Sequence, residues 1–176
     1  MNSKSKNNSV YSLSISLIWL FLSSCSSPVN ENKLIKSLTT NHIKLEPIAE
    51  LILSSGDGTI IDLRDKPVRI EPNTLSQNLK PEWLKELKHL NISFATFDRS
   101  FNGVLFEIEG NGIGISGSSA GYIYFQSKPE DSSIELVEDI EKTFKQKKAA
   151  LKKNESLDVK LVKKVKPSWG IYLETF

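Results

Sequence analysis

The stretch GVLFEIEGNGIGISGSSAGYIYF, residues 103–125, predicts a series of antiparallel strands and therefore the β part of the fold. Apolar and polar side chains alternate at its beginning, which is the period of a strand with one buried face. Asn111-Gly112 is typical of a two-residue hairpin turn, because a type I′ turn needs a positive φ at both positions. That turn would place Phe106 opposite Gly117, and Tyr122–Phe125 would follow as a third strand.

Helical periodicity on both sides of this stretch predicts about three helices. Pro47 interrupts the first of them, so we expect either a kink or two consecutive helices there. The expected helices begin at Asn30 and end near Gly56, begin at Pro81 and end near Asn91, and begin at a Ser132-x-x-Glu135 capping pattern and end near Lys153.

The remaining apolar segments are short and predict strands, which makes the chain an α+β protein. We expect a single domain, residues 33–176, in which an antiparallel β-meander sheet packs against the helices. Residues 64–80 are rich in proline, asparagine and charge, and they predict mostly loop. The further strands expected are Thr59–Leu63, Ile92–Phe97, Asp158–Val165 and Gly170–Phe176.

The glycines of the quoted stretch match two functional patterns without the context that either needs. Gly112, Gly114 and Gly117 form G-x-G-x-x-G, but a dinucleotide loop must open a helix, and a strand is expected here. Ser119 is the centre of a G-x-S-x-G pattern, but a nucleophile elbow also needs a helix directly after the serine. Turn geometry is the simpler explanation of these glycines.

Candidate bases and metal ligands are few. The two histidines, His42 and His89, are expected on helices, so a serine hydrolase using Ser119 is the least favoured interpretation. Two histidines and a single cysteine cannot build a common zinc site. Glu107 and Glu109 share one strand face, and such a pair is most simply its solvated side. We therefore expect no catalytic residue, no metal and no cofactor.

The N-terminus predicts export. Lys4 and Lys6 precede the apolar run Val10–Leu22, which is shorter than the roughly 20 residues of a membrane-spanning helix. Leu22-Ser23-Ser24-Cys25 then resembles the lipobox of bacterial lipoproteins. The resemblance implies a signal peptide over residues 1–24, lipidation of Cys25 by diacylglycerol, and a lipidated tether over residues 25–32.

Two further features agree with this resemblance. Cys25 is the only cysteine, and lipidation would leave no stray thiol in an exported protein. Ser26 takes the place of the aspartate that often retains such lipoproteins at the inner membrane. The resemblance therefore implies an anchor in the outer membrane, with the domain facing the periplasm.

The charge balance excludes one class of partner. Without Lys4 and Lys6, 21 basic side chains face 21 acidic ones, so the mature chain lacks the basic footprint of a nucleic-acid binder. Lysines are concentrated in residues 142–166. They are either the solvated end of a helix and an exposed strand, which we favour, or a patch for anionic lipid headgroups or an acidic protein.

The serine-rich turn favours binding rather than catalysis. Together with the lysine downstream, it resembles the serine-glycine and lysine motifs of the membrane-bound inhibitors of c-type lysozyme, which are envelope lipoproteins. The resemblance implies a loop that enters an enzyme cleft, although that family is a small β-barrel with a different motif spacing. The expected binding loop comprises Ser116, Ser118, Ser119, Tyr122 and Lys128.

The mature pattern also resembles small bacterial α+β proteins without an established activity, through the serine-glycine turn before Gly121-Tyr-x-Tyr and the terminal Trp169-x-x-Tyr. We expect a non-catalytic binding protein of the envelope, such as an immunity or inhibitor protein against a periplasmic toxin or lytic enzyme. The alternative is an accessory or structural component of an outer-membrane assembly. The expected partners are the membrane, through the lipid anchor, and a periplasmic protein.

Overall fold

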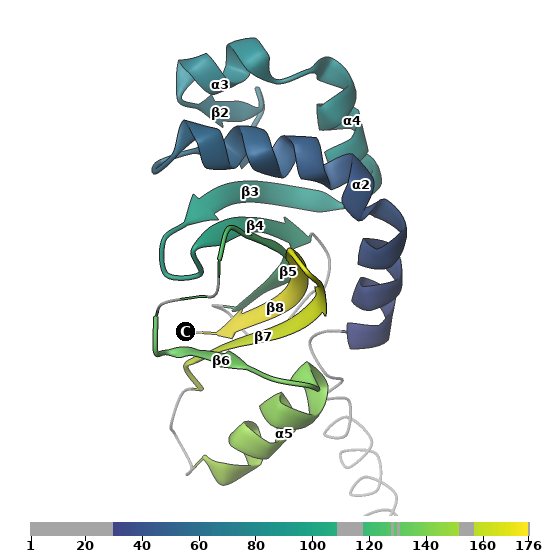
Figure 1. Cartoon of the computed structure of the whole chain (residues 1–176), viewed down its shortest axis with the longest axis vertical. Helices are drawn as coiled ribbons and strands as arrows, with labels where there is room; N and C mark the ends of the chain where they lie inside the picture. Colours follow the sequence, from purple (N-terminus) through teal and green to yellow (C-terminus); the bar gives the residue numbers. More distant parts are fainter. Residues whose placement is uncertain (1–29, 109–117, 128, 130, 152–156, 176) are drawn as a thin grey trace, which may run out of the picture.

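The computed structural model describes residues 30–108, 118–127, 129, 131–151 and 157–175. Within these residues the chain is an α+β protein with one largely antiparallel sheet. Figure 1 shows α2 along the sheet, α3 and α4 at one end of the molecule and α5 at the other. The described helices number four rather than three: α2 Glu31–Ser55, α3 Asn73–Asn78, α4 Pro81–His89 and α5 Ile140–Ala150.

The longest helix, α2, begins and ends where the sequence predicts. The Asn30 side chain accepts a hydrogen bond from the Lys33 N–H at 2.9 Å and so caps the first turn. Gly56 ends the helix with a φ of 76°, which glycine adopts without a Cβ clash. Pro47 lies inside one continuous helix, and Figure 1 shows α2 changing direction along its length. Of the two alternatives, the kinked helix is the one observed.

In the described part of the chain, eight strands form a sheet in the order β2-β1-β3-β4-β5-β8-β7-β6. Neighbouring strands are antiparallel except β6 and β7, which are parallel. Since β8 and β7 lie between β5 and β6, the sheet as a whole is not a meander. The strands are β1 Ile60–Asp62, β2 Arg69–Glu71, β3 Ile92–Asp98, β4 Gly103–Ile108, β5 Ser118–Phe125, β6 Ile134–Leu136, β7 Val159–Lys166 and β8 Trp169–Thr175.

The register of β4 against β5 differs from the predicted hairpin. Phe106 pairs with Tyr122 and Leu105 pairs with Ile123, so Phe106 does not lie opposite Gly117. This register sets large side chains against one another on both faces of the sheet, and all four are at most 6% exposed. Burial of apolar surface on two sides therefore decides the pairing. The predicted two-residue turn itself lies outside the described residues.

The sheet buries side chains on both faces, although alternation had predicted one buried face. Face A is the side that packs against α2, whose Leu38, Ile48 and Ile52 have no exposed surface. Face B is the opposite side, where the ring of Phe101 in the β3–β4 loop lies 5.8 Å from that of Tyr172. A smaller core forms there from Phe101, Leu105, Ile123, Ile134, Val162 and Tyr172.

Two other predictions are wrong. Residues 64–80 are not simply a loop, because they contain β2 and α3. The last helix does not begin at the Ser132-x-x-Glu135 pattern, since this part of the chain enters β6 and α5 starts only at Ile140. Asp139 is the actual cap, because its carboxylate accepts from the Lys142 N–H at 2.7 Å. Pairing of β6 with β7 decides this segment, and a local capping pattern cannot anticipate it.

Reciprocal hydrogen bonds join the N-termini of α2 and α5. The Glu31 carboxylate accepts from the N–H of Ile140 at 2.7 Å and of Glu141 at 3.2 Å, while the Glu31 N–H donates to the Glu141 carboxylate at 3.0 Å. Each helix thus supplies a carboxylate that accepts hydrogen bonds from backbone N–H groups at the N-terminus of the other helix. The Lys163 ammonium lies 2.5 Å from the same Glu31 carboxylate, whose side chain is 8% exposed. Residues 30–32 of the predicted tether therefore belong to α2 and its cap, beside α5.

Candidate functional site

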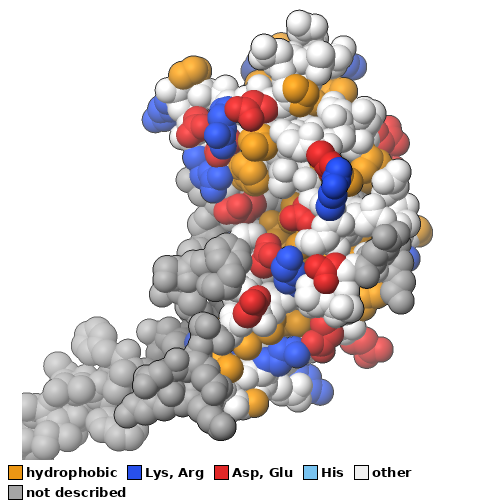
Figure 2. Space-filling view, turned by 90° about the vertical axis from the view of Figure 1, so that its left-hand side faces the viewer, with side chains coloured by type: hydrophobic (Ala, Val, Ile, Leu, Met, Phe, Trp, Pro, Cys, Tyr) orange, Lys and Arg blue, Asp and Glu red, His pale blue; other side chains and the backbone are white. Residues whose placement is uncertain are grey.

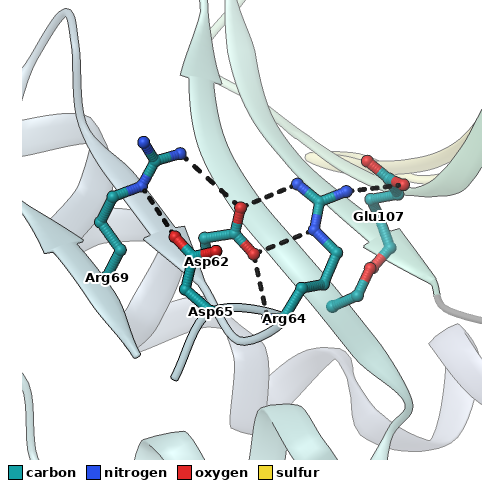
Figure 3. Close-up of polar contacts among 6 residues, drawn as sticks. Asp62, Arg64, Asp65, Arg69 and Glu107 are labelled. Carbon is teal, nitrogen blue, oxygen red and sulfur yellow. Dashed lines mark hydrogen bonds and ion pairs between the residues drawn. The ribbon is translucent and has the colours of Figure 1, made fainter. Parts of the chain in front are cut away.

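A network of charged side chains lies on face B at the β1 and β2 end of the sheet (Figure 3). Asp62, the last residue of β1, is at its centre with a side chain that is 6% exposed. Its carboxylate accepts two hydrogen bonds from the Arg64 guanidinium, each of 2.9 Å, and one from the Arg64 backbone N–H at 3.0 Å. This bidentate contact holds the Arg64 fork in one orientation.

Three further residues extend the network on either side of the central aspartate. The Arg69 guanidinium lies 3.7 Å from that aspartate and 3.4 Å from the carboxylate of Asp65. The Arg64 guanidinium lies 3.6 Å from the carboxylate of Glu107 on β4, and 5.0 Å from the centre of the Phe94 ring. Both arginine side chains remain about half exposed, at 48% and 47%.

The electrostatics of the network favour permanently charged groups rather than proton transfer. The hydrogen bond from Arg64 lowers the pKa of Asp62, although burial acts in the opposite direction. Asp62 is therefore ionised at neutral pH and cannot serve as an acid. An arginine cannot serve as a base, because it stays protonated in proteins. The arrangement instead holds two half-exposed guanidiniums in fixed orientations among three carboxylates, and an anionic group of a binding partner would have to displace Asp65 or Glu107 to reach them.

A second polar group on face B surrounds Ser119, which lies on β5. Its hydroxyl donates a hydrogen bond to the Tyr172 hydroxyl at 3.2 Å. Glu174 is the register partner of Ser119 and forms an ion pair of 3.4 Å with Lys160. Burial raises the pKa of Glu174 against the opposing effect of Lys160, and burial also raises the pKa of Tyr172. Among the described residues, Ser119 thus contacts a hydroxyl and not a base.

Lys160 connects this group to the β3–β4 loop. Its ammonium donates to the Ser100 hydroxyl at 3.3 Å and lies 5.5 Å from the centre of the Phe101 ring. Ser100 donates in turn to the Asp98 carboxylate at 2.6 Å. These contacts hold the loop over face B.

Figure 2 shows one side of the molecule, where acidic and basic side chains lie close together and form no broad area of a single charge.

The predicted binding loop is not gathered in one described loop. Ser118 and Ser119 are strand residues of β5. Tyr122 is 1% exposed and donates to the Ser37 hydroxyl of α2 at 2.7 Å, so its side chain belongs to the core under α2. Three other predicted site residues lie outside the described residues, namely Cys25, Ser116 and Lys128.

Both histidines lie on helices, as predicted. His42 Nδ1 contacts the Thr39 carbonyl oxygen of its own helix at 3.1 Å, and His89 is the last residue of α4. In the part of the chain that the structure describes, no three His, Cys, Asp or Glu side chains are grouped so that they could hold a metal ion.

The charged network was not among the sequence-predicted sites. The segment Asp62-Leu-Arg-Asp-Lys-Pro-Val-Arg69 alternates acids and bases directly after a short strand, and this alternation is the signal that could have marked it. Glu107 could not be added from the sequence, because only the pairing of β1, β3 and β4 brings it to Arg64. The contact of Lys160 with Glu174 likewise follows from the β7–β8 register.

Within the described ranges, no helix is both long and apolar enough to span a membrane. No family model matches the chain, and no match was found among curated proteins or solved structures.

Proposed function

We propose that this chain is an exported, lipid-anchored envelope protein whose domain binds another protein and is not an enzyme. The anchor rests on the lipobox-like Leu22–Cys25, with the outer membrane as the expected location. The favoured partner is a toxin or lytic enzyme of the periplasm, which the domain would block as an immunity or inhibitor protein.

The observation that carries the binding part is the pair of half-exposed arginines, Arg64 and Arg69, held beside the buried carboxylate of Asp62. Ordering a flexible side chain at an interface costs about 0.5–1.5 kcal/mol. Folding has already ordered these two side chains, so less of that cost remains when a partner binds. Arginine is also one of the residues that most often dominate the binding energy of an interface.

The chemistry of the partner follows from the shape and charge of these groups. An arginine side chain matches a carboxylate in shape and charge, and enzymes that cleave glycosidic bonds carry paired carboxylates in their clefts. Asp65 and Glu107 already lie 3.4 Å and 3.6 Å from the two guanidiniums. A partner must therefore compete with these two acids, which favours a closely fitting acidic cleft over any acidic surface.

An affinity pull-down from detergent-solubilised envelope, with the tag at the C-terminus, tests the proposal. One abundant toxin or hydrolase in the eluate would support it, and the activity of that protein could then be titrated with the domain. A set of subunits from one envelope assembly would favour an accessory role instead. An eluate without an enriched partner would contradict binding under the growth conditions used.

Arg69→Gln tests the site itself once a partner is in hand. We expect the complex to weaken about tenfold, which corresponds to about 1.4 kcal/mol. Arg99→Gln is the matched control, because this arginine is 82% exposed and pairs with Asp57 outside the network. Equal affinities for the two variants would contradict a role for the network in binding.

The proposal that the domain is not an enzyme has a separate test. Replacing Ser118 and Ser119 together by alanine should leave the blocking activity intact. If the purified protein instead hydrolyses an ester or amide substrate and the double variant loses that turnover while it stays folded, the domain is a serine hydrolase.

A further inference from the structure

The corner formed by α2 and α5 fixes the place where the tether meets the domain. Asn30 caps α2, and Glu31 is bound to the first turn of α5 and to Lys163. Five residues lead from Cys25 to Asn30, and a fully extended chain of that length spans at most about 18 Å. An anchored Cys25 therefore keeps this corner within about 18 Å of the membrane, whatever path the tether takes.

The helix at this corner presents lysines to solvent. Lys142, Lys145 and Lys148 are all exposed, and the sequence of α5 contains a single acid, Glu141. The Glu141 carboxylate is engaged by the Glu31 N–H and lies 3.7 Å from Lys145. Lysines thus predominate on the solvent side of α5 beyond its first turn, whereas the exposed acids Glu138 and Asp139 directly precede the helix.

We propose that α5 lies against the anionic headgroups of the membrane that holds the lipid anchor, so that the domain has a fixed orientation. This inference rests on the proposed anchoring through Cys25. The anchor already holds the domain at the surface, so the lysines need only select which end faces it. A lysine near an anionic surface favours contact by roughly fivefold.

The place of the α5 lysines beside the tether distinguishes them from other exposed lysines. The opposite end of the molecule also has exposed lysines, Lys85 and Lys88 on α4. Attraction to a charged surface fades beyond a Debye length of about 8 Å at physiological salt. The short tether brings only the α2–α5 corner within reach of that range, because α4 and α5 lie at opposite ends of the molecule (Figure 1).

The orientation has a consequence for the candidate site. The sheet order places β1 and β2 at one edge of the sheet and β6 at the other, next to β7 and α5. With α5 on the membrane, the arginine network beside β1 and β2 lies at the end of the sheet away from the lipid. It is then open to a periplasmic partner.

Depth-dependent quenching in reconstituted vesicles measures the orientation. The lipidated protein carries a fluorophore on one introduced cysteine, at Gln146→Cys on α5 or at Gln77→Cys on α3, both exposed positions. The vesicles contain phosphatidylcholine alone or with phosphatidylglycerol, and the quencher is bound to the headgroups. We expect several-fold stronger quenching at the α5 position in anionic vesicles. The difference should shrink in neutral vesicles and at high salt.

A charge variant with a matched control identifies the cause. Lys142→Gln/Lys145→Gln should lose most of the preference for the α5 position, up to about 25-fold at roughly fivefold per lysine. Lys85→Gln/Lys88→Gln removes the same charge at the same helical spacing from the other end and should leave the preference unchanged.

The outcomes separate this inference from the proposals on which it rests. Equal quenching at both positions in anionic vesicles, with an acylated N-terminal peptide in the mass spectrum, overturns the orientation alone. An N-terminal peptide without acyl groups overturns the anchor and the orientation together. Loss of the preference in the Lys85→Gln/Lys88→Gln control also overturns it, because the effect would then not belong to α5. Partner binding is judged separately, by Arg69→Gln.

Discussion

Replacing Glu31 by alanine should destabilise the domain by about 3 kcal/mol, although the residue lies at the edge of the fold. The Glu31 carboxylate accepts hydrogen bonds from two backbone N–H groups at the start of α5 and pairs with Lys163 at 2.5 Å. With 8% of its side chain exposed, water cannot replace these contacts fully.

The size of the effect follows from these contacts. A hydrogen bond to a charged group contributes about 1.5–3 kcal/mol, but adding three such values would overstate the loss. Lys163 is 26% exposed and can turn toward water, and the Asp139 cap on α5 remains in place. Breaking a buried ion pair costs about 3–5 kcal/mol, and these two compensations favour the lower end.

Urea denaturation and thermal unfolding measure the loss. For a domain of this size, about 3 kcal/mol lowers Tm by roughly 6–12 °C. Glu50→Ala is the control, because this exposed glutamate lies on the same helix and should change stability by less than about 0.5 kcal/mol. In a double-mutant cycle, Lys163→Met should cost less when Glu31 is already alanine. A loss below about 1 kcal/mol for Glu31→Ala would refute this account of the corner.

Four further substitutions test three other parts of the structure. The pKa of Asp62 is lowered in the folded state, so its contribution to stability is present above the unfolded pKa of about 3.9 and is lost as the pH falls further. Asp62→Asn should therefore make the urea midpoint fall less steeply as the pH is lowered through the acid range. Gly121→Ala should cost about 3 kcal/mol or more, because the added Cβ would lie 1.9 Å from the Phe106 carbonyl oxygen; an unchanged Tm would contradict the β4–β5 pairing. Tyr172→Phe removes the acceptor of the Ser119 hydroxyl and should cost about 1 kcal/mol in chemical denaturation, and Ser119→Ala should cost a similar amount.

Caps and turns within a few residues were accessible from the sequence. Asn30 and Gly56 bound α2 as predicted, and Pro81 opens α4. These signals are local, since a cap or a fixed φ acts on the adjoining backbone. The strands β1, β3, β7 and β8 were also predicted, because runs of β-branched and aromatic residues mark them. The lipobox-like N-terminus is local in the same sense, and its lipidation remains a prediction.

Pairing between distant segments decided the rest. The sequence contains the Asn111-Gly112 turn signal, yet β4 and β5 meet in a register that buries Phe106 against Tyr122. Ser118 and Ser119 of the predicted loop are strand residues for the same reason. The arginine network needed Glu107 from another strand, and the α2–α5 corner needed Glu31 to meet a helix more than 100 residues away. Local chemistry determined where α2 begins and ends and where α4 begins. Burial and charge pairing over long separations determined which side chains meet, because those energies exist only once distant segments of the chain lie together.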